Sequence, residues 1–305
     1  MNSISYFKII EQYICYSLQY KFNKIRMSNI MKNEVYQTIR TERNGGVATI
    51  FINNPPVNVL GTKLMKELKT VLQEYAGDDT VKVIVFESDN SEFFIAHVDI
   101  NILDDQEAVE ELTKDVYEGL NIFQTIGEII RRQPQVTIVK LKGIARAGGA
   151  EFVAAADMSF ASLETGKIGQ TEALMGIIPG GGATQYLSEK MPRNRVLEVI
   201  LGAELFDAKD AERYGWINRS VPDSEIDLFV DKLAQQIASL PDGVVATVKK
   251  VLPPANLQQG YQKENDGWLE LVSKPKAAEI FSSIMKKGAQ TPDVEKEIET
   301  LLRSL

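Results

Sequence analysis

Two glutamates lie in glycine-rich surroundings where a carboxyl group could do chemical work. Glu151 follows Gly148 and Gly149, and Glu172 lies among Ile, Leu, Met and Gly residues. An ionised carboxylate is costly to bury among such neighbours, so Glu172 is paired, exposed or functional. Glu151 also has a purely structural interpretation, because an acidic residue in the first turn of a helix complements the helix dipole.

The glycines at 148 and 149 lie where the apolar stretch 136–141 leads into the Ala-rich segment 150–156. Small residues at such a junction let a ligand approach the backbone closely. The first N–H groups of the following helix have no partner within the helix, and its dipole favours negative charge there. These are the physical requirements of an oxyanion hole. A second glycine cluster at 179–182 repeats the pattern, and neither cluster matches the GxxxxGK[ST] or GxGxxG patterns of nucleotide-binding loops.

Hydrophobic spacing predicts the elements that must position these residues. The order strand, helix, strand, helix, strand favours an α/β fold with a mostly parallel sheet. Short β-rich runs indicate strands at 47–52, 81–87 and 136–141, and apolar residues at helical spacing indicate helices at 64–75 and 109–126. Beyond Pro192 the pattern is predominantly helical, with helices expected at 193–214, 223–239, 257–272 and 292–304.

The composition limits the kinds of site that the chain can hold. The 305 residues carry a net charge of −8, one cysteine, Cys15, and one histidine, His97. A zinc site built from several Cys and His ligands is excluded, and no metal is expected. An acidic chain is poorly suited to nucleic acid or anionic membranes, and no apolar run approaches the roughly 18 residues that span a bilayer. A single cysteine forms no intrachain disulfide, which favours a reducing, cytoplasmic location.

Residues 1–34 differ from the rest and are expected to form a loosely attached N-terminal extension. They lack a long apolar region with a small-residue cleavage site, so they are a poor secretory signal. With Glu11 present and Arg26 as the single arginine, they are a poor transit peptide as well. Met27 could be a second start, and the alternative is a short amphipathic helix that binds a partner.

Taken together, the glycine- and alanine-rich segments resemble the enoyl-CoA hydratase/isomerase (crotonase) superfamily. The resemblance implies a crotonase-like α/β spiral of repeated strand-strand-helix turns with a helical C-terminal part. It covers roughly residues 35–300. The segments that carry it are FFIAHVDI at 93–100, GIARAGGAE at 143–151 and GQTEALMGIIPGGGATQ at 169–185, with further similarity at 55–61 and 200–222.

The resemblance also implies a division of the chain. Residues 35–195 should form the α/β core with an acyl-CoA site, and residues 196–305 a helical region that serves oligomerisation. A homotrimer or homohexamer is expected. The C-terminal region carries more apolar residues than its own core needs, among them Trp268, Leu269, Leu271 and Val272.

The family's functional positions can be carried over residue by residue. The backbone N–H groups of Val98 and Gly148 would hold the thioester oxygen. Glu151 would activate water and Glu172 would supply the proton, because hydration needs one carboxylate and one carboxylic acid. A close pair in an apolar pocket favours one ionised and one protonated member. Contacts to substrate and coenzyme A are implied for Asn58, Ala96, His97, Asp99, Ile100, Gly149, Pro179, Gly180 and Lys286.

Two residues depart from the family pattern. His97 replaces a glycine in the usual Ala-Gly-Ala-Asp sequence. It is either an acid, base or substrate contact, or a loop residue that tolerates an unusual φ angle. Arg146 stands where leucine is common, and it either brings a charge near the pocket or, as the typical behaviour of arginine favours, lies solvated at the surface.

The resemblance implies hydration of a 2-enoyl-CoA to a 3-hydroxyacyl-CoA, with coenzyme A as part of the substrate and no separate cofactor. Both glutamates are present, which favours hydration over relatives that keep one. The alternatives are an enoyl-CoA isomerase or a thioester hydrolase on the same scaffold, since a fold does not fix a reaction. A noncatalytic RNA- or acyl-CoA-binding protein is the alternative from another class, against which the acidic charge and the intact glutamate pair argue.

Overall fold

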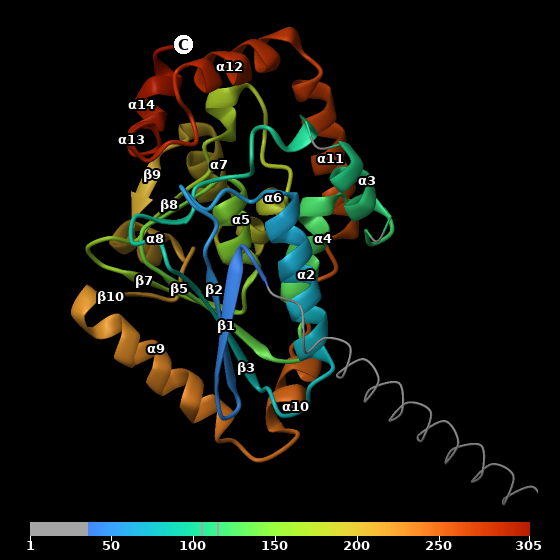
Figure 1. The fold of residues 1–305 in the computed structure, drawn as a ribbon, viewed down its shortest axis with the longest axis vertical. Coiled ribbons are helices and arrows are strands. Elements are labelled where there is room, and N and C mark those ends of the chain that lie inside the picture. The colour runs from blue at the N-terminus through green and yellow to red at the C-terminus, as the bar shows by residue number, and fades with distance from the viewer. Residues whose placement is uncertain (1–35, 105, 115) are drawn as a thin grey trace, which may run out of the picture.

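Two β-sheets form the centre of the fold (Figure 1). The computed structural model describes residues 36–104, 106–114 and 116–305. Within that part of the chain, the larger sheet has the order β1-β2-β3-β5-β7-β10, with β1 and β2 antiparallel and the other pairs parallel. Its strands are β1 Ile39–Asn44, β2 Val47–Ile52, β3 Val83–Ser88, β5 Val136–Leu141, β7 Met158–Ser162 and β10 Arg219–Val221.

The smaller sheet consists of three-residue strands in the order β4-β6-β8-β9. Each of β4, β6 and β8 follows a strand of the larger sheet, and a helix comes next in the chain. The chain therefore repeats strand, strand and helix, which confirms the expected spiral fold. The bounds are β4 Phe93–Ile95, β6 Ile144–Arg146, β8 Lys167–Gly169 and β9 Leu205–Asp207.

Helices cover both faces of the larger sheet. Along β3, Val83 and Val85 pack into the core beneath α9, while Ile84 and Phe86 belong to the core that contains α2 and α5. This alternation follows from the two-residue period of a strand. The helices of this α/β part are α2 Thr62–Ala76, α3 Gln106–Thr113, α4 Ile122–Arg131, α5 Gly148–Ala155, α6 Ala183–Lys190, α7 Arg193–Gly202, α8 Ala208–Tyr214 and α9 Asp223–Ala238.

The final helices of the chain, from Pro275 onward, gather at the end of the molecule opposite α9, at the top of Figure 1. Ile280, Ile284, Ile298 and Leu302 give them a small apolar core of their own. Among the described residues, none of the helices is long and apolar enough to cross a membrane. The remaining helices are α10 Val244–Val251, α11 Gln258–Val272, α12 Pro275–Lys286, α13 Pro292–Glu295 and α14 Ile298–Arg303.

The single long helix expected at 109–126 is wrong, because α3 and α4 are separate. Gly119 has a φ of +74° in the connection, a conformation that suits glycine. Asn121 then caps α4, accepting from the N–H groups of Phe123 and Gln124, while Gln124 bonds back to the Asn121 N–H. The N-x-x-Q capping signal was readable in the sequence.

Two further expected helices are also interrupted. The stretch 193–214 contains α7, β9 and α8, and the side chain of Asp207 caps α8 by accepting from the Asp210 N–H. The stretch 292–304 contains α13 and α14. In both places the hydrophobic spacing continues across the break between the elements.

The α/β region extends beyond the expected boundary at residue 195. Strand β9 pairs with β8, and β10 pairs with β7, so both sheets continue into the region expected to be helical. The predicted extension at residues 1–34 lies outside the described residues.

Candidate active site

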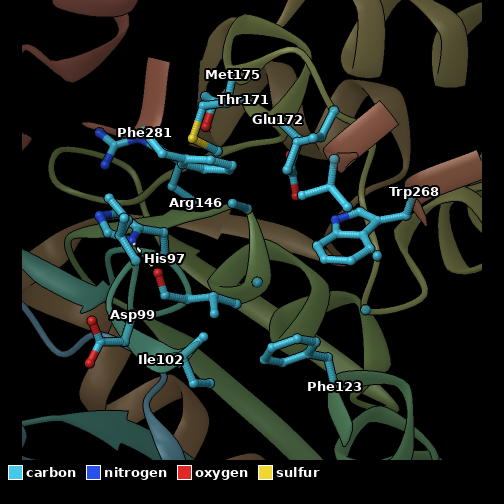
Figure 2. A pocket seen from close by; sticks show the side chains of 18 of the residues that line it. His97, Asp99, Ile102, Phe123, Arg146, Thr171, Glu172, Met175, Trp268 and Phe281 are labelled. Atoms are coloured by element: carbon cyan, nitrogen blue, oxygen red, sulfur yellow. Dashed lines mark hydrogen bonds between the residues drawn. The ribbon is translucent and has the colours of Figure 1, made fainter. Parts of the chain in front are cut away.

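A cavity of about 530 Å³ lies between the α/β spiral and the C-terminal helices. Figure 2 shows Phe123 and Trp268 on its walls, with Phe281 on a further side and Glu172 directed inward. Ile102, Val109, Ile122 and Phe123 contribute part of the apolar wall. The cavity is therefore mostly apolar, with a few polar groups at defined places.

Glu151 lies in the first turn of α5, is buried, and lines this cavity. Its Oε1 accepts from the N–H groups of Gly181 at 2.7 Å and Ala183 at 3.1 Å. A Cβ at position 181 would lie 2.3 Å from Glu151 Oε2, so any larger residue there would displace the carboxylate. Burial, and then the charge of Glu264, raise the pKa of Glu151 to about 8, although the two N–H groups favour the anion.

Glu172 begins the 3₁₀ helix Glu172–Met175, is buried, and lines the same cavity. With its amide nitrogen turned toward the carboxyl, Gln170 donates to Oε2 at 3.0 Å and to Oε1 at 2.9 Å. Burial, followed by the charge of Glu151, raises the pKa of Glu172 well above its ordinary value. The structure thus brings together the two glutamates that the sequence singled out.

A third buried carboxyl, Glu264 on α11, was missed from the sequence. It accepts from the N–H groups of Gly182 at 2.7 Å and Thr184 at 3.0 Å, next to those that Glu151 uses. Burial raises the pKa of Glu264 despite these donors. The sequence did carry a signal for its burial, because Glu264 lies at helical spacing between the aromatic residues Tyr261 and Trp268. All three side chains turn inward in the structure.

The candidate oxyanion donors Val98 and Gly148 lie side by side on the cavity wall. A Cβ on Gly148 would lie 3.6 Å from Val98 N and 2.5 Å from Val98 Cγ2, so a larger residue at 148 would displace the Val98 side chain. Neither N–H has an acceptor among the described residues. Gly149 is equally constrained, because a Cβ there would clash with the carbonyl oxygen of Ile95.

The other predicted contact residues divide into two groups. His97, Asp99, Ile100 and Gly180 line the cavity. Asn58, Ala96, Gly149 and Pro179 are buried outside its lining, and Lys286 is exposed at the end of α12. The Asn58 amide instead donates to Phe93 O at 3.2 Å and Phe94 O at 3.1 Å, which ties its loop to β4.

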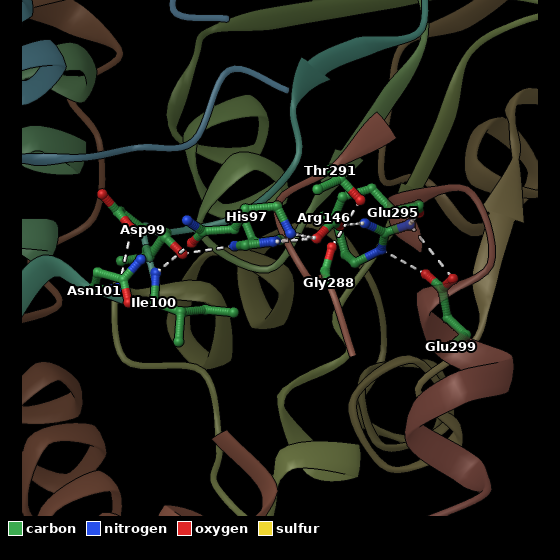
Figure 3. Close-up of polar contacts among 11 residues, drawn as sticks. His97, Asp99, Ile100, Asn101, Arg146, Gly288, Thr291, Glu295 and Glu299 are labelled. Carbon is green, nitrogen blue, oxygen red and sulfur yellow. Dashed lines mark hydrogen bonds and ion pairs between the residues drawn. The ribbon is translucent and has the colours of Figure 1, made fainter. Parts of the chain in front are cut away.

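The surface location favoured for Arg146 is wrong. Arg146 is 1% exposed, lines the cavity, and pairs with Glu295 at 3.0 Å and Glu299 at 2.5 Å. His97 is also buried, has no positive φ, and its Nε2 lies 2.9 Å from Glu295 Oε1. The two family departures therefore belong to one ion-pair cluster (Figure 3).

Glu295, the carboxyl at the centre of this cluster, has a lowered pKa, unlike the carboxyls near α5. Burial alone would raise the pKa of Glu295, but hydrogen bonding from His97, the charges of His97 and Arg146, and the Gln290 N–H bring it below its ordinary value. Glu295 and Glu299 were missed because nothing in their local sequence marks them.

The apolar C-terminal residues expected to serve oligomerisation are split by the structure. Trp268 and Val272 line the cavity, whereas Leu269 is 58% exposed. The excess of apolar residues on α11 is thus explained partly by the cavity that this helix covers.

The comparisons with known proteins agree with this geometry. The model of the enoyl-CoA hydratase/isomerase family matches residues 42–281. The chain therefore belongs to the enoyl-CoA hydratase/isomerase family.

Relatives and solved structures cover most of the chain. The short-chain-enoyl-CoA hydratase of Clostridium acetobutylicum is 28% identical over 256 residues, which are 84% of this chain and 94% of the relative. A “probable enoyl-CoA hydratase” of Rhizobium meliloti is 32% identical over 215 residues, covering 69% and 80%. The crystal structure of a “putative enoyl-CoA hydratase” from Streptomyces avermitilis is 54% identical, with a TM-score of 0.88 and coverage of 88% and 98%.

Proposed function

We propose that this chain is an enoyl-CoA hydratase-like enzyme that adds water across a 2-enoyl-CoA to give a 3-hydroxyacyl-CoA. The observation that carries the proposal is the pair Glu151 and Glu172. Both are buried on one apolar cavity and neither forms an ion pair among the described residues. Family membership and the names of the relatives support the same reaction class.

The proposed mechanism begins with the thioester oxygen between the N–H groups of Val98 and Gly148. These donors stabilise the negative charge that develops on oxygen as water adds to the β-carbon. Glu151 removes a proton from the water while its Oε1 stays fixed by Gly181 and Ala183. The carboxylic acid of Glu172 delivers a proton to the α-carbon, which completes the addition.

The raised pKa of Glu172 fits a proton donor, because a carboxyl whose pKa is raised by burial holds its proton near neutral pH. Glu151 acts as the base in its ionised form, which the N–H groups of Gly181 and Ala183 favour against the effect of burial. The charge of one glutamate opposes ionisation of the other, which favours one proton shared by the pair. The apolar wall keeps bulk water from the enolate-like intermediate.

The proposed substrate is an acyl-CoA thioester, with coenzyme A as part of the substrate and no separate cofactor. We further propose a homotrimer or homohexamer in the cytoplasm. Equilibrium sedimentation tests the assembly, and a stable, active monomer at micromolar concentration would contradict it.

Product analysis with a panel of enoyl-CoA thioesters tests the function. A hydratase yields a 3-hydroxyacyl-CoA without free coenzyme A, an isomerase moves the double bond without taking up water, and a thioester hydrolase releases the thiol. The expected result is the first, and thiol release without hydration would overturn the proposal. Salt-dependent RNA binding without turnover of any acyl-CoA would favour the noncatalytic alternative.

A further inference from the structure

One buried carboxylate contacts both chain segments that carry the candidate oxyanion donors (Figure 3). Glu295 Oε1 lies 2.9 Å from His97 Nε2, and Oε2 accepts from Arg146 Nη1 at 3.0 Å. The Glu295 backbone carbonyl also accepts from Arg146 Nη2 at 3.0 Å. His97 directly precedes Val98, and Arg146 lies two residues before Gly148.

Both nitrogens of the His97 ring lie against oxygen atoms. His97 Nδ1 lies 2.6 Å from the carbonyl oxygen of Val98. Nε2 lies 2.9 Å from Glu295 Oε1, which also accepts from the Gln290 N–H at 2.8 Å. The ring is therefore held on both sides, between the segment that carries Val98 and the C-terminal turn.

A further contact fixes the first segment to the same C-terminal turn. The N–H of Ile100 donates to Gln290 Oε1 at 2.7 Å. The groups that face His97 and Arg146 thus come from α13, α14 and the turn before them, while Asp99 turns to the N–H of Asn101. The end of the chain joins two segments whose contact residues, His97 and Arg146, lie 49 positions apart.

We propose that Glu295 is a positioning residue for the oxyanion hole, which sets the placement of the Val98 and Gly148 N–H groups through His97 and Arg146. The inference rests on the proposed function, because the hole acts on a thioester oxygen. The two donors must converge on one atom, and displacement by about 1 Å can lower a rate by ~10²-fold. A merely structural role would instead tie down the C-terminal helices and affect stability alone.

The test compares Glu295→Gln with wild type, using a cinnamoyl-CoA with a 4-dimethylamino group as the probe. Polarisation of its carbonyl moves the absorption band to longer wavelength. Wild type should shift the band on binding, and Glu295→Gln should bind the probe with a much smaller shift. With a turned-over enoyl-CoA, kcat should fall about 10- to 100-fold while KM changes little, because the interaction acts mainly in the transition state.

Glu128→Gln is the matched control. Glu128 is also a buried glutamate, paired with Arg131, Arg132 and Tyr261, but it lies outside the cavity lining. This variant should lose stability and keep the full band shift. His97→Gln removes one of the two connections and supplies a second test if Glu295→Gln does not fold; its band shift should be intermediate.

Glu151→Gln separates this inference from the proposed function, since it should lose turnover and retain the full band shift. A full shift and wild-type kcat in folded Glu295→Gln, or in His97→Gln, would overturn the positioning role and leave the proposed function intact. Wild-type protein that neither shifts the band nor hydrates any enoyl-CoA would overturn both.

Discussion

Two clusters of buried glutamates lie within one molecule and differ in their partners. Near α5, Glu151, Glu172 and Glu264 accept hydrogen bonds from neutral donors, and their pKa values are raised, chiefly by burial. At the C-terminal end, Glu295 is equally buried, but it contacts His97 and Arg146 and its pKa is lowered. Burial is common to both clusters, so the presence of a cation decides whether the pKa of each carboxyl is raised or lowered.

The difference explains how one cavity can use carboxyls in two ways. A carboxyl without a cation can gain and lose a proton near neutral pH, which suits proton transfer. A carboxyl held by two cations stays ionised and gives fixed geometry. Glu128, with Arg131 and Arg132, shows the second behaviour away from the cavity, and its pKa is also lowered against the effect of burial.

The largest expected effect is a loss of turnover when Glu151 or Glu172 is replaced. Glu151→Gln and Glu172→Gln should each lower kcat roughly 10²- to 10⁴-fold, because each removes an ionisable group and keeps its volume. Substrate affinity should barely change, since the oxyanion donors remain. Steady-state hydration kinetics, with binding measured separately, check this.

The double variant should lose less than the product of the two single losses, because the glutamates act as a unit. Near wild-type hydration by Glu151→Gln would refute the two-carboxylate assignment. The same result with Glu172→Gln impaired would point to a one-glutamate isomerase.

The second largest effect is expected on the free energy of unfolding, which should fall when Arg146 is removed from its ion pairs with Glu295 and Glu299. Arg146→Met leaves Glu295 and Glu299 without their arginine and should destabilise the fold by about 3–5 kcal/mol. Arg40→Met is the control, since Arg40 pairs with Asp89 at a solvated site and should cost about 1 kcal/mol or less. Denaturant unfolding measures both, and equal losses would show that burial of the Arg146 pairs has no consequence.

The pH dependence of stability should differ in sign between the clusters. Glu151 has a folded pKa of about 8 against an ordinary 4.5, so between these values the folded state keeps a proton that the unfolded state has lost. Wild-type stability then falls as pH rises through this window. Glu151→Gln removes that loss and should gain stability over wild type, by roughly 1 kcal/mol or more at pH 8.

For Glu295, whose folded pKa is lowered, the sign is reversed. Its ionised form stabilises the fold above the ordinary pKa and loses that contribution as pH falls, so Glu295→Gln should be destabilised most at neutral pH. Thermal unfolding from about pH 3 to 8 compares the variants, because the Glu295 contribution is lost below its ordinary pKa of 4.5. A constant difference between Glu151→Gln and wild type across this range would contradict the unpaired state of Glu151.

The smallest effect is expected at a place that belongs to neither cluster. A chain beginning at Met27 should fold, assemble and turn over normally, because the family match begins at residue 42. Size-exclusion chromatography and hydration kinetics on this shortened chain provide the check. Loss of assembly would show that the preceding residues are structural.

The sequence by itself predicted an α/β fold, and its resemblance to the family predicted the spiral. The segments at 93–100, 143–151 and 169–185 each combine a short strand, small residues and an acidic or backbone group, and they were enough to single out Glu151 and Glu172. The helix interruption before Asn121 was also readable, through its capping signal, but hydrophobic spacing alone concealed it.

Only the tertiary structure decided the ionic surroundings of the site. Glu295 and Glu299 lie in a stretch of alternating charges that resembles any solvated helix. Their partner Arg146 precedes Glu295 by 149 residues in the chain. Nothing local distinguishes a buried partner from an exposed one, because burial depends on the C-terminal helices closing over the spiral. The same closure turns Trp268 and Glu264 inward, and it therefore sets both the cavity wall and the charge beside Glu151.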